Sequence, residues 1–249
     1  MTHGEQRDAT TGALERNALE GRAPSLRLTD FRPVGGQHPR CIAIEGPIGV
    51  GKTSLAIRLA TTFGLETILE PSFDNPYLER FYRHGQQYAL PTQLYFLLKR
   101  GELLKQLTTP DLFRSGWVCD FVLEKDTLFA ELTLKEDDIQ LYRQLHTHIA
   151  GEFQRPELVI YLQAPPAVLM ERVRQRGLAP EQRITLDYLE NLCAAYARLF
   201  HFYDQSRLLI VNAGDANFVD DDVQYADLVQ RIVNTQGPRD YYNPQPGLL

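Results

Sequence analysis

The sequence predicts an α/β protein with a five-stranded parallel sheet flanked by helices on both sides. Short, almost continuously apolar runs, typical of strands buried on both faces, recur along the chain. Longer stretches with helical spacing separate these runs, and neither a repeat nor a Ser/Gly linker interrupts the alternation. Strand–helix alternation of this kind favours parallel strands joined by crossover helices.

The five expected strands read CIAI, LETIL, WVCDF, LVIYL and LLIV, and the second is the least apolar. They lie at residues 41–44, 65–69, 117–121, 158–162 and 208–211. Stretches with helical spacing lie at 52–63, 89–107, 135–153, 165–176 and 184–205. The acidic run at 220–222 is expected to cap a final helix, because carboxylates are favourable at a helix N-terminus.

One domain is expected, at residues 39–235. Residues 1–38 are polar and lack a sustained period, which predicts a flexible N-terminal arm with a short helix near 11–21. Residues 236–249 contain three prolines and two glycines and are expected to form a flexible C-terminal tail.

Composition excludes several classes of protein. The chain has 249 residues, and its net charge of −6 argues against bulk nucleic-acid binding, which needs a basic face. The sequence has no run of 18 apolar residues that could span a membrane, and its first residues lack the apolar core of a signal peptide. Cys41, Cys119 and Cys193 are too far apart for a zinc motif. We therefore expect a cytoplasmic protein whose folding needs neither a disulfide nor a metal ion.

Residues 46–53 read GPIGVGKT and match the pattern G-x-x-x-x-G-K-[ST], between an expected strand and an expected helix. Glycines let backbone N–H groups turn onto phosphate oxygens, and the helix N-terminus adds positive charge. Lys52 can bridge the β- and γ-phosphates, and the Thr53 hydroxyl can ligate Mg²⁺. The residues expected to bind the nucleotide are Gly46, Pro47, Ile48, Gly49, Val50, Gly51, Lys52, Thr53 and Ser54.

Three classes of protein use such a loop. A GTPase needs an Asn-Lys-x-Asp motif and an Asp-x-x-Gly motif, but Asp120 is followed by Phe-Val-Leu. A mechanical ATPase usually has adjacent acids at the end of a strand, where this chain offers one. A small-molecule kinase needs a mobile lid rich in arginine. Such a lid is present, with a glycine and a proline among four arginines: Arg172, Arg174, Arg176, Gly177, Pro180 and Arg183.

Seven segments between about residue 40 and residue 211 resemble, in this order, the deoxyribonucleoside kinases, bacterial members included. They are IEGPIGVGKTSL, LEPSFDNPYLERFY, TQLYFLLKR, DFVLEKDTLFA, LYRQLH, RPELVIYL and ERVRQRG…EQRITLDYLENL. The loop alone is common to many families, whereas the ordered set is specific. The resemblance implies a P-loop kinase fold with an arginine-rich lid. It also implies transfer of the γ-phosphoryl group of ATP, or GTP, to the 5′-hydroxyl of a deoxyribonucleoside, with Mg²⁺, in a homodimer.

The resemblance also implies catalytic roles. Glu70, after the second strand, matches the carboxylate that contacts the 5′-hydroxyl and acts as general base, and ligands bind at this edge of parallel sheets. Asp120 can hold a Mg²⁺-bound water or assist the base, so Thr53 and Asp120 are the expected metal residues. Arg172 and Arg176 match lid arginines that neutralise charge on the transferred group.

On the nucleoside side, Tyr82 and Gln93 match the family's sugar-contacting tyrosine and base-reading glutamine, and Glu181 matches the acid on the 3′-hydroxyl. An amide side chain both donates and accepts, so it can pair with a base edge. The aromatic candidates to sandwich the base are Tyr77, Phe96, Phe121 and Phe129.

The chain departs from the family pattern in two places. Animal members carry an acid-Arg-Ser triplet where this chain reads Cys119-Asp120-Phe121, and Lys125 is the candidate to replace the missing arginine. The lid reads Arg176-Gly177-Leu178 where the family often has Arg-Gly-Arg, so Arg174 or Arg183 is the candidate for the lost contact.

Two other functions share these motifs. A nucleoside monophosphate kinase of the thymidylate kinase type has the same loop and lid, but it needs a basic pocket for the acceptor's own phosphate. A non-catalytic, nucleotide-gated binding protein would bind ATP without rapid turnover. No nucleic acid or membrane partner is expected.

Overall fold

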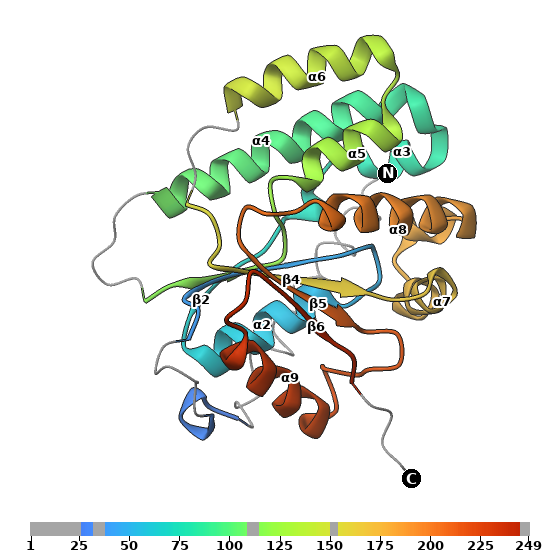
Figure 1. Ribbon diagram of the computed structural model, residues 1–249. Coiled ribbons are helices and arrows are strands. Elements are labelled where there is room, and N and C mark those ends of the chain that lie inside the picture. Colours follow the sequence, from blue (N-terminus) through green and yellow to red (C-terminus); the bar gives the residue numbers. More distant parts are fainter. Residues whose placement is uncertain (1–25, 32–37, 109–114, 150–153, 245–249) are drawn as a thin grey trace.

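A single parallel sheet organises the described part of the chain, in the order β2-β3-β1-β4-β5-β6 (Figure 1). The computed structural model describes residues 26–31, 38–108, 115–149 and 154–244. The strands are β1 Cys41–Glu45, β2 Glu66–Ile68, β3 Trp117–Cys119, β4 Leu158–Gln163, β5 Arg207–Asn212 and β6 Arg239–Tyr242. The expected parallel α/β architecture is thus confirmed.

The sheet has six strands in the described residues, so the prediction of five was wrong. The additional strand, β6, lies within the segment expected to be a flexible tail. Its backbone pairs with β5 from Leu208↔Arg239 to Val211↔Tyr242, and Tyr242 donates a 2.6 Å hydrogen bond to Asp227. A flexible tail was expected because of the prolines in this segment. They lie on either side of the strand, so its own N–H groups can pair with β5.

The N-terminal arm falls mostly outside the described residues, and so does its expected helix near 11–21. In the described part, a short 3₁₀ turn, Leu28–Asp30, precedes Phe31, which is buried in the core. Residues 245–249 of the expected tail and 150–153 of an expected helix also lie outside the described residues.

Helices cover both faces of the sheet. They are α2 Lys52–Phe63, α3 Leu78–His84, α4 Ala89–Thr108, α5 Lys125–Thr133, α6 Glu136–Ile149, α7 Pro166–Arg176, α8 Leu186–His201 and α9 Asp222–Asn234. Figure 1 shows α4, α5, α6 and α8 on one side of the sheet and α2 and α9 on the other. In the described chain, no helix has the length and apolarity needed to cross a bilayer.

The sheet forms the centre of the core because its inner strands are apolar on both faces. All five residues of β1 and the first five of β4 are buried. Entry into β3 depends on Gly116, whose φ is +141° and whose Cβ, if it had one, would lie 2.1 Å from the Arg40 carbonyl oxygen. Only glycine fits where the chain approaches β1 so closely. Because β1, β2 and β3 are parallel, their carboxyl ends lie along one edge of the sheet, where functional residues collect.

Candidate active site

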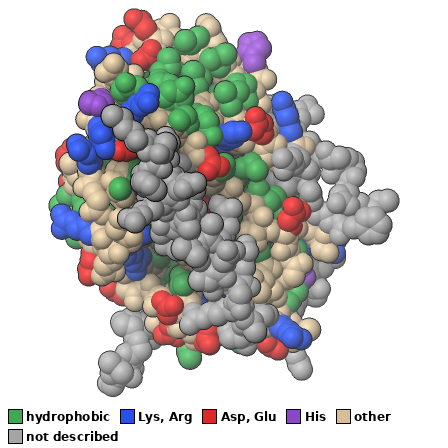
Figure 2. All heavy atoms as spheres, turned by 180° about the vertical axis from the view of Figure 1, so that it is seen from behind, with side chains coloured by type: hydrophobic (Ala, Val, Ile, Leu, Met, Phe, Trp, Pro, Cys, Tyr) green, Lys and Arg blue, Asp and Glu red, His purple; other side chains and the backbone are tan. Residues whose placement is uncertain are grey.

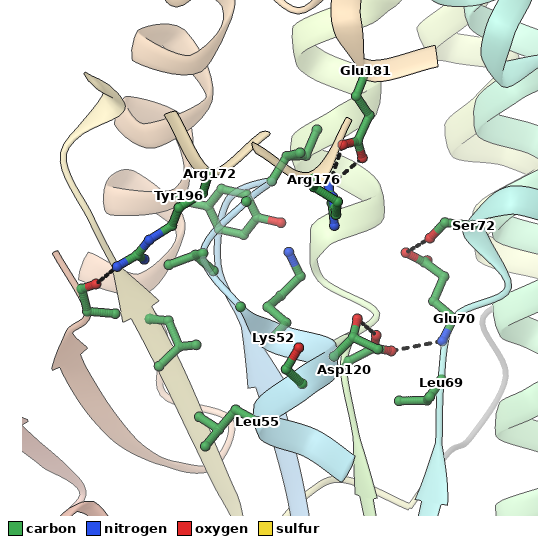
Figure 3. A pocket seen from close by; sticks show the side chains of 18 of the residues that line it. Lys52, Leu55, Leu69, Glu70, Ser72, Asp120, Arg172, Arg176, Glu181 and Tyr196 are labelled. Atoms are coloured by element: carbon green, nitrogen blue, oxygen red, sulfur yellow. Dashed lines mark hydrogen bonds and ion pairs between the residues drawn. The ribbon is translucent and has the colours of Figure 1, made fainter. Parts of the chain in front are cut away.

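A cavity of about 890 Å³ opens at the carboxyl edge of the sheet. The residues around it come from the loop after β1, the ends of β2 and β3, helices α2, α3, α4, α5 and α8, the α7 lid and the loop after β5. Figure 3 shows Lys52 near the middle, with Glu70 and Asp120 to one side and Arg172 to the other. The predicted phosphate and acceptor groups therefore share one space.

The loop between β1 and α2 has the backbone of a phosphate cradle. Gly46, Gly49 and Gly51 have positive φ values of 151°, 84° and 99°. A side chain at Gly46 would also meet the Leu162 carbonyl oxygen at 2.4 Å. Residues 48–54 line the cavity, whereas Gly46 and Pro47 are buried and contribute carbonyl groups. Because α2 begins at Lys52, its unpaired N–H groups point to the same anion site.

Lys52 lies at the centre of this cradle. Its Nζ donates hydrogen bonds to the carbonyl oxygens of Gly46, at 2.7 Å, and Pro47, at 3.2 Å. Burial lowers the pKa of this ammonium to about 8, against the attraction of nearby carboxylates, of which Glu45 has the largest effect. A triphosphate would offer the ammonium better partners than two carbonyls, so its binding should favour the charged form.

Thr53, Asp120 and the backbone of residue 70 form a hydrogen-bonded chain. The Thr53 hydroxyl donates to Asp120 Oδ2 at 2.6 Å, and the Glu70 N–H donates to Asp120 Oδ1 at 2.8 Å. Burial raises the pKa of Asp120, partly offset by the Thr53 hydrogen bond. One hydroxyl and one carboxylate beside a phosphate cradle are oxygen donors of the kind that Mg²⁺ accepts together with water and substrate phosphates.

The Glu70 carboxylate is held between two cations. Arg100 Nε donates to Oε1, and Lys125 Nζ lies 3.0 Å from Oε2. Burial on its own raises the pKa of Glu70, but the charges of Arg100 and Lys125 outweigh this effect and lower it to about 2. Glu70 is therefore ionised throughout the physiological pH range, and it borders the cavity.

The predicted nucleoside residues converge on the same cavity. Tyr82 on α3, Gln93 on α4 and Glu181 in the lid all line it, and Gln93 is buried there. Glu181 accepts a hydrogen bond of 2.6 Å from Arg176, so these two predicted site residues form an ion pair. Burial raises the pKa of the Tyr82 hydroxyl well above its ordinary value, which keeps it a hydrogen-bond donor.

Arg172 binds the chain itself. One guanidinium nitrogen donates to the carbonyl oxygens of residues 213, 214 and 216, at 2.9, 3.0 and 3.3 Å. It thereby ties the lid helix to the loop after β5. Arg174 and Arg183, the candidates for the missing lid contact, do not line the cavity.

Phe121 is placed differently from the prediction. Its side chain is buried in the hydrophobic core and is not among the residues that line the cavity. The residue lies just after β3, which ends at Cys119, and its side chain takes the inward direction. Tyr77 also lies outside the cavity lining, whereas Phe96 and Phe129 belong to it.

Sequence reasoning missed three charged residues of the site. Arg100, Asp126 and Glu45 are each at most 2% exposed, and Arg100 forms ion pairs with both Glu70 and Asp126. One signal was available for Arg100, since it follows Gln93 by seven residues on α4 and so lies on the same helix face. Glu45 follows the apolar run of β1, and Asp126 stands in a charged run after Glu124 and Lys125, so neither position shows such a pattern.

Fold and cavity place the chain among the P-loop kinases, because the phosphate cradle and an acceptor carboxylate face each other under an arginine lid. Comparison with known proteins narrows this class. A sequence model described as deoxynucleoside kinase matches residues 42–236. The chain therefore belongs to the deoxynucleoside kinase family, and it phosphorylates deoxyribonucleosides.

Two relatives illustrate the similarity in sequence. A deoxyguanosine kinase of Bacillus subtilis is 34% identical over 62% of this chain and 75% of its own length. A deoxyadenosine kinase of Dictyostelium discoideum is 31% identical over 82% of this chain and 83% of its own length. The solved deoxyadenosine kinase from M. mycoides with bound dCMP superposes with a TM-score of 0.67. It covers 77% of this chain and 97% of its own at 24% identity, which supports the fold.

Proposed function

We propose that the chain transfers the γ-phosphoryl group of ATP, or GTP, to the 5′-hydroxyl of a deoxyribonucleoside, with Glu70 as the group that binds and deprotonates this hydroxyl. The observation that carries the proposal is the hydrogen-bonded connection from Thr53 through Asp120 to residue 70. It fixes the distance between the phosphate cradle and the acceptor carboxylate.

The donor is held by the loop at residues 46–54. Backbone N–H groups and Lys52 bind the phosphates, and Thr53 and Asp120 would hold Mg²⁺. When bound, the ion neutralises phosphate charge and orients the donor. Arg172 and Arg176 are the proposed lid arginines for the transferred group. Both have partners in this structure, three backbone carbonyls for Arg172 and the Glu181 carboxylate for Arg176, and either side chain would exchange them for phosphoryl oxygens.

The mechanism depends on how a carboxylate with a pKa near 2 serves as a base. Such a group is a weak base toward a free alcohol, but it accepts a hydrogen bond at every physiological pH. Phosphoryl transfer has a loose transition state, so the hydroxyl becomes strongly acidic only as the new bond forms. Glu70 thus orients the hydroxyl first and takes its proton late, while Arg100 and Lys125 hold the carboxylate in place.

Lys125 is proposed to replace the arginine of the family triplet. Its Nζ lies 3.0 Å from Glu70 and it lines the cavity, so a positive charge is present beside the acceptor although the triplet is absent. The charge comes from the first residue of α5 instead of the end of β3.

Tyr82 and Glu181 are proposed to bind the sugar and Gln93 the base edge. The tyrosine ring against C2′ would disfavour ribose by steric exclusion. The relatives named deoxyguanosine and deoxyadenosine kinase make the purine deoxynucleosides the first substrates to test. Phe96 and Phe129 are the described aromatic candidates for stacking.

A homodimer in the cytoplasm is proposed as the working form. Apolar residues Leu98 on α4 and Leu141 on α6 are about half exposed, which suits a helix–helix interface. The three cysteines have free thiols, as is usual in a reducing compartment.

The test is to incubate the protein with γ-labelled ATP and each of the four deoxynucleosides, their ribose counterparts and thymidine monophosphate. Labelled deoxynucleoside 5′-monophosphates are expected, with ribonucleosides at least about tenfold poorer in kcat/KM. Faster labelling of thymidine monophosphate would favour the monophosphate kinase. A lack of any turnover, with ATP still bound, would favour the binding protein. Lys52→Ala serves as the control, because it removes the ammonium from the cradle.

A further inference from the structure

Glu45 is a carboxylate with no exposed surface, at the point where β1 ends and the phosphate loop begins. Neither the motif nor the mechanism above assigns it a role. A buried carboxylate is costly unless several donors compensate it, so its partners indicate what it stabilises.

Four donors from four segments surround Glu45. Its Oε1 accepts hydrogen bonds of 2.9 Å from the Gly46 N–H and 2.9 Å from the Tyr196 hydroxyl. Its Oε2 accepts one of 3.0 Å from the Val122 N–H, and Lys125 Nζ lies 3.8 Å from the same oxygen. A single side chain thus connects the phosphate loop, the loop after β3, helix α5 and helix α8.

We propose that Glu45 is a positioning residue that holds the phosphate loop in register with the acceptor carboxylate. The connection runs from the Gly46 backbone through Glu45 to Lys125, which in turn binds Glu70. This inference rests on the proposed function, in which the loop holds the donor and Glu70 the acceptor. It complements the connection through Asp120, which joins the same two parts from the other end of the loop.

The deciding measurement is a double-mutant cycle in kcat between Glu45 and Lys125, with MgATP affinity measured by calorimetry. Glu45→Gln should lower kcat at least about tenfold, because the amide presents a donor to Val122 or Lys125. In the Lys125→Met background the same substitution should lower kcat by less than about threefold, because the connection to Glu70 is already broken.

Two further variants separate position from charge. Tyr196→Phe removes one hydrogen bond and keeps the carboxylate, so it should lower kcat less than Glu45→Gln does. Glu45→Asp keeps the charge on a shorter side chain. It should lower kcat and weaken MgATP binding, since the Gly46 and Val122 hydrogen bonds lengthen. If Glu45→Gln does not fold, Glu45→Asp in the same cycle decides.

The results distinguish this inference from the proposed function. A Lys52→Ala variant with wild-type MgATP affinity would remove Lys52 from its role and contradict the proposed donor site. Equal fold losses of kcat for Glu45→Gln in both backgrounds, or no loss in either, would overturn only the role of Glu45. A fully active Glu45→Asp with wild-type MgATP affinity would do the same.

Discussion

Glu70 illustrates how neighbouring charges set the function of a single residue. A carboxylate in so buried a site would otherwise tend to hold its proton, but Arg100 and Lys125 keep it ionised. The site therefore starts each turnover with an acceptor group ready to receive a hydrogen bond from an alcohol. Because of its low pKa, Glu70 should stay ionised over the whole pH range in which the kinetics are measured.

Glu70→Gln should lower kcat by about 10²–10⁴, because an amide cannot take the proton, and should leave MgATP affinity within about twofold. In the wild-type protein, Glu70 loses its proton near pH 2, so it should contribute no fall in kcat between pH 5 and 7. Steady-state kinetics over this range, with calorimetry for MgATP, checks both expectations. Full turnover in the variant would show that Glu70 is not the base.

Lys125→Met should lower kcat by about 10- to 100-fold, since Glu70 loses the ammonium 3.0 Å from its Oε2. Lys125→Arg should recover much of this activity, because the guanidinium restores the charge that other family members place nearby. The kcat of both variants with one deoxynucleoside is the measurement. A methionine variant with wild-type kcat would contradict the proposed replacement of the missing arginine.

At the residue scale, the sequence identified those candidate site residues that belong to recognisable motifs. Lys52, Glu70 and Gln93, which the sequence singled out, all line one cavity. The sequence did not identify Arg100 or Asp126, because their significance comes from a buried ion pair between α4 and α5. The expected strand at 117–121 ends two residues earlier, at Cys119, and Phe121 is buried in the core beyond it.

Among the elements, β3 shows how a single backbone position can support the site. Its three residues pair with both β1 and β2, and Asp120 follows directly. The close approach of Gly116 to the Arg40 carbonyl sets where this strand begins, and therefore where Asp120 lies relative to Thr53.

Gly116→Ala should reduce the free energy of unfolding by about 1–3 kcal/mol, because the new methyl group overlaps the Arg40 carbonyl at a φ that alanine rarely adopts. Gly237→Ala is the matched control, since a Cβ there would meet its nearest atom at 3.6 Å. Urea denaturation measures both. Equal midpoints for the two variants would show that this approach is not tight in solution.

The elements themselves were predictable where apolar runs are long. The strands β1, β4 and β5 and the helix α2 agree with the expected ranges to within two residues at each end. Helix α5 was missed because it begins with buried Lys125 and Asp126, which conceal its apolar face. Strand β6 was missed because its four residues, RDYY, lie among prolines and glycines and form a strand only by pairing with β5.

At the scale of the whole molecule, one surface is the candidate interface for the proposed homodimer. Figure 2 shows hydrophobic side chains gathered at the end of the molecule that carries α4, α5 and α6. Within this region, Leu98 is 51% exposed and Leu141 is 45% exposed.

Leu98→Glu should raise the dissociation constant of the homodimer at least about tenfold, because it places a charge on an apolar contact. Phe202→Glu is the control, since Phe202 is 79% exposed at the end of α8 and lies outside this helix group. Sedimentation velocity compares the two variants with the wild-type protein. A Leu98→Glu protein that stays dimeric would show that this face is not the dimer interface.

The position of β6 has a practical consequence for engineering. A chain cut ahead of residue 238 would lack this border strand, and the bare amides of β5 could recruit the same edge of another molecule. Such shortened chains should form particles that scatter light during purification, whereas chains that end after residue 244 should remain clear.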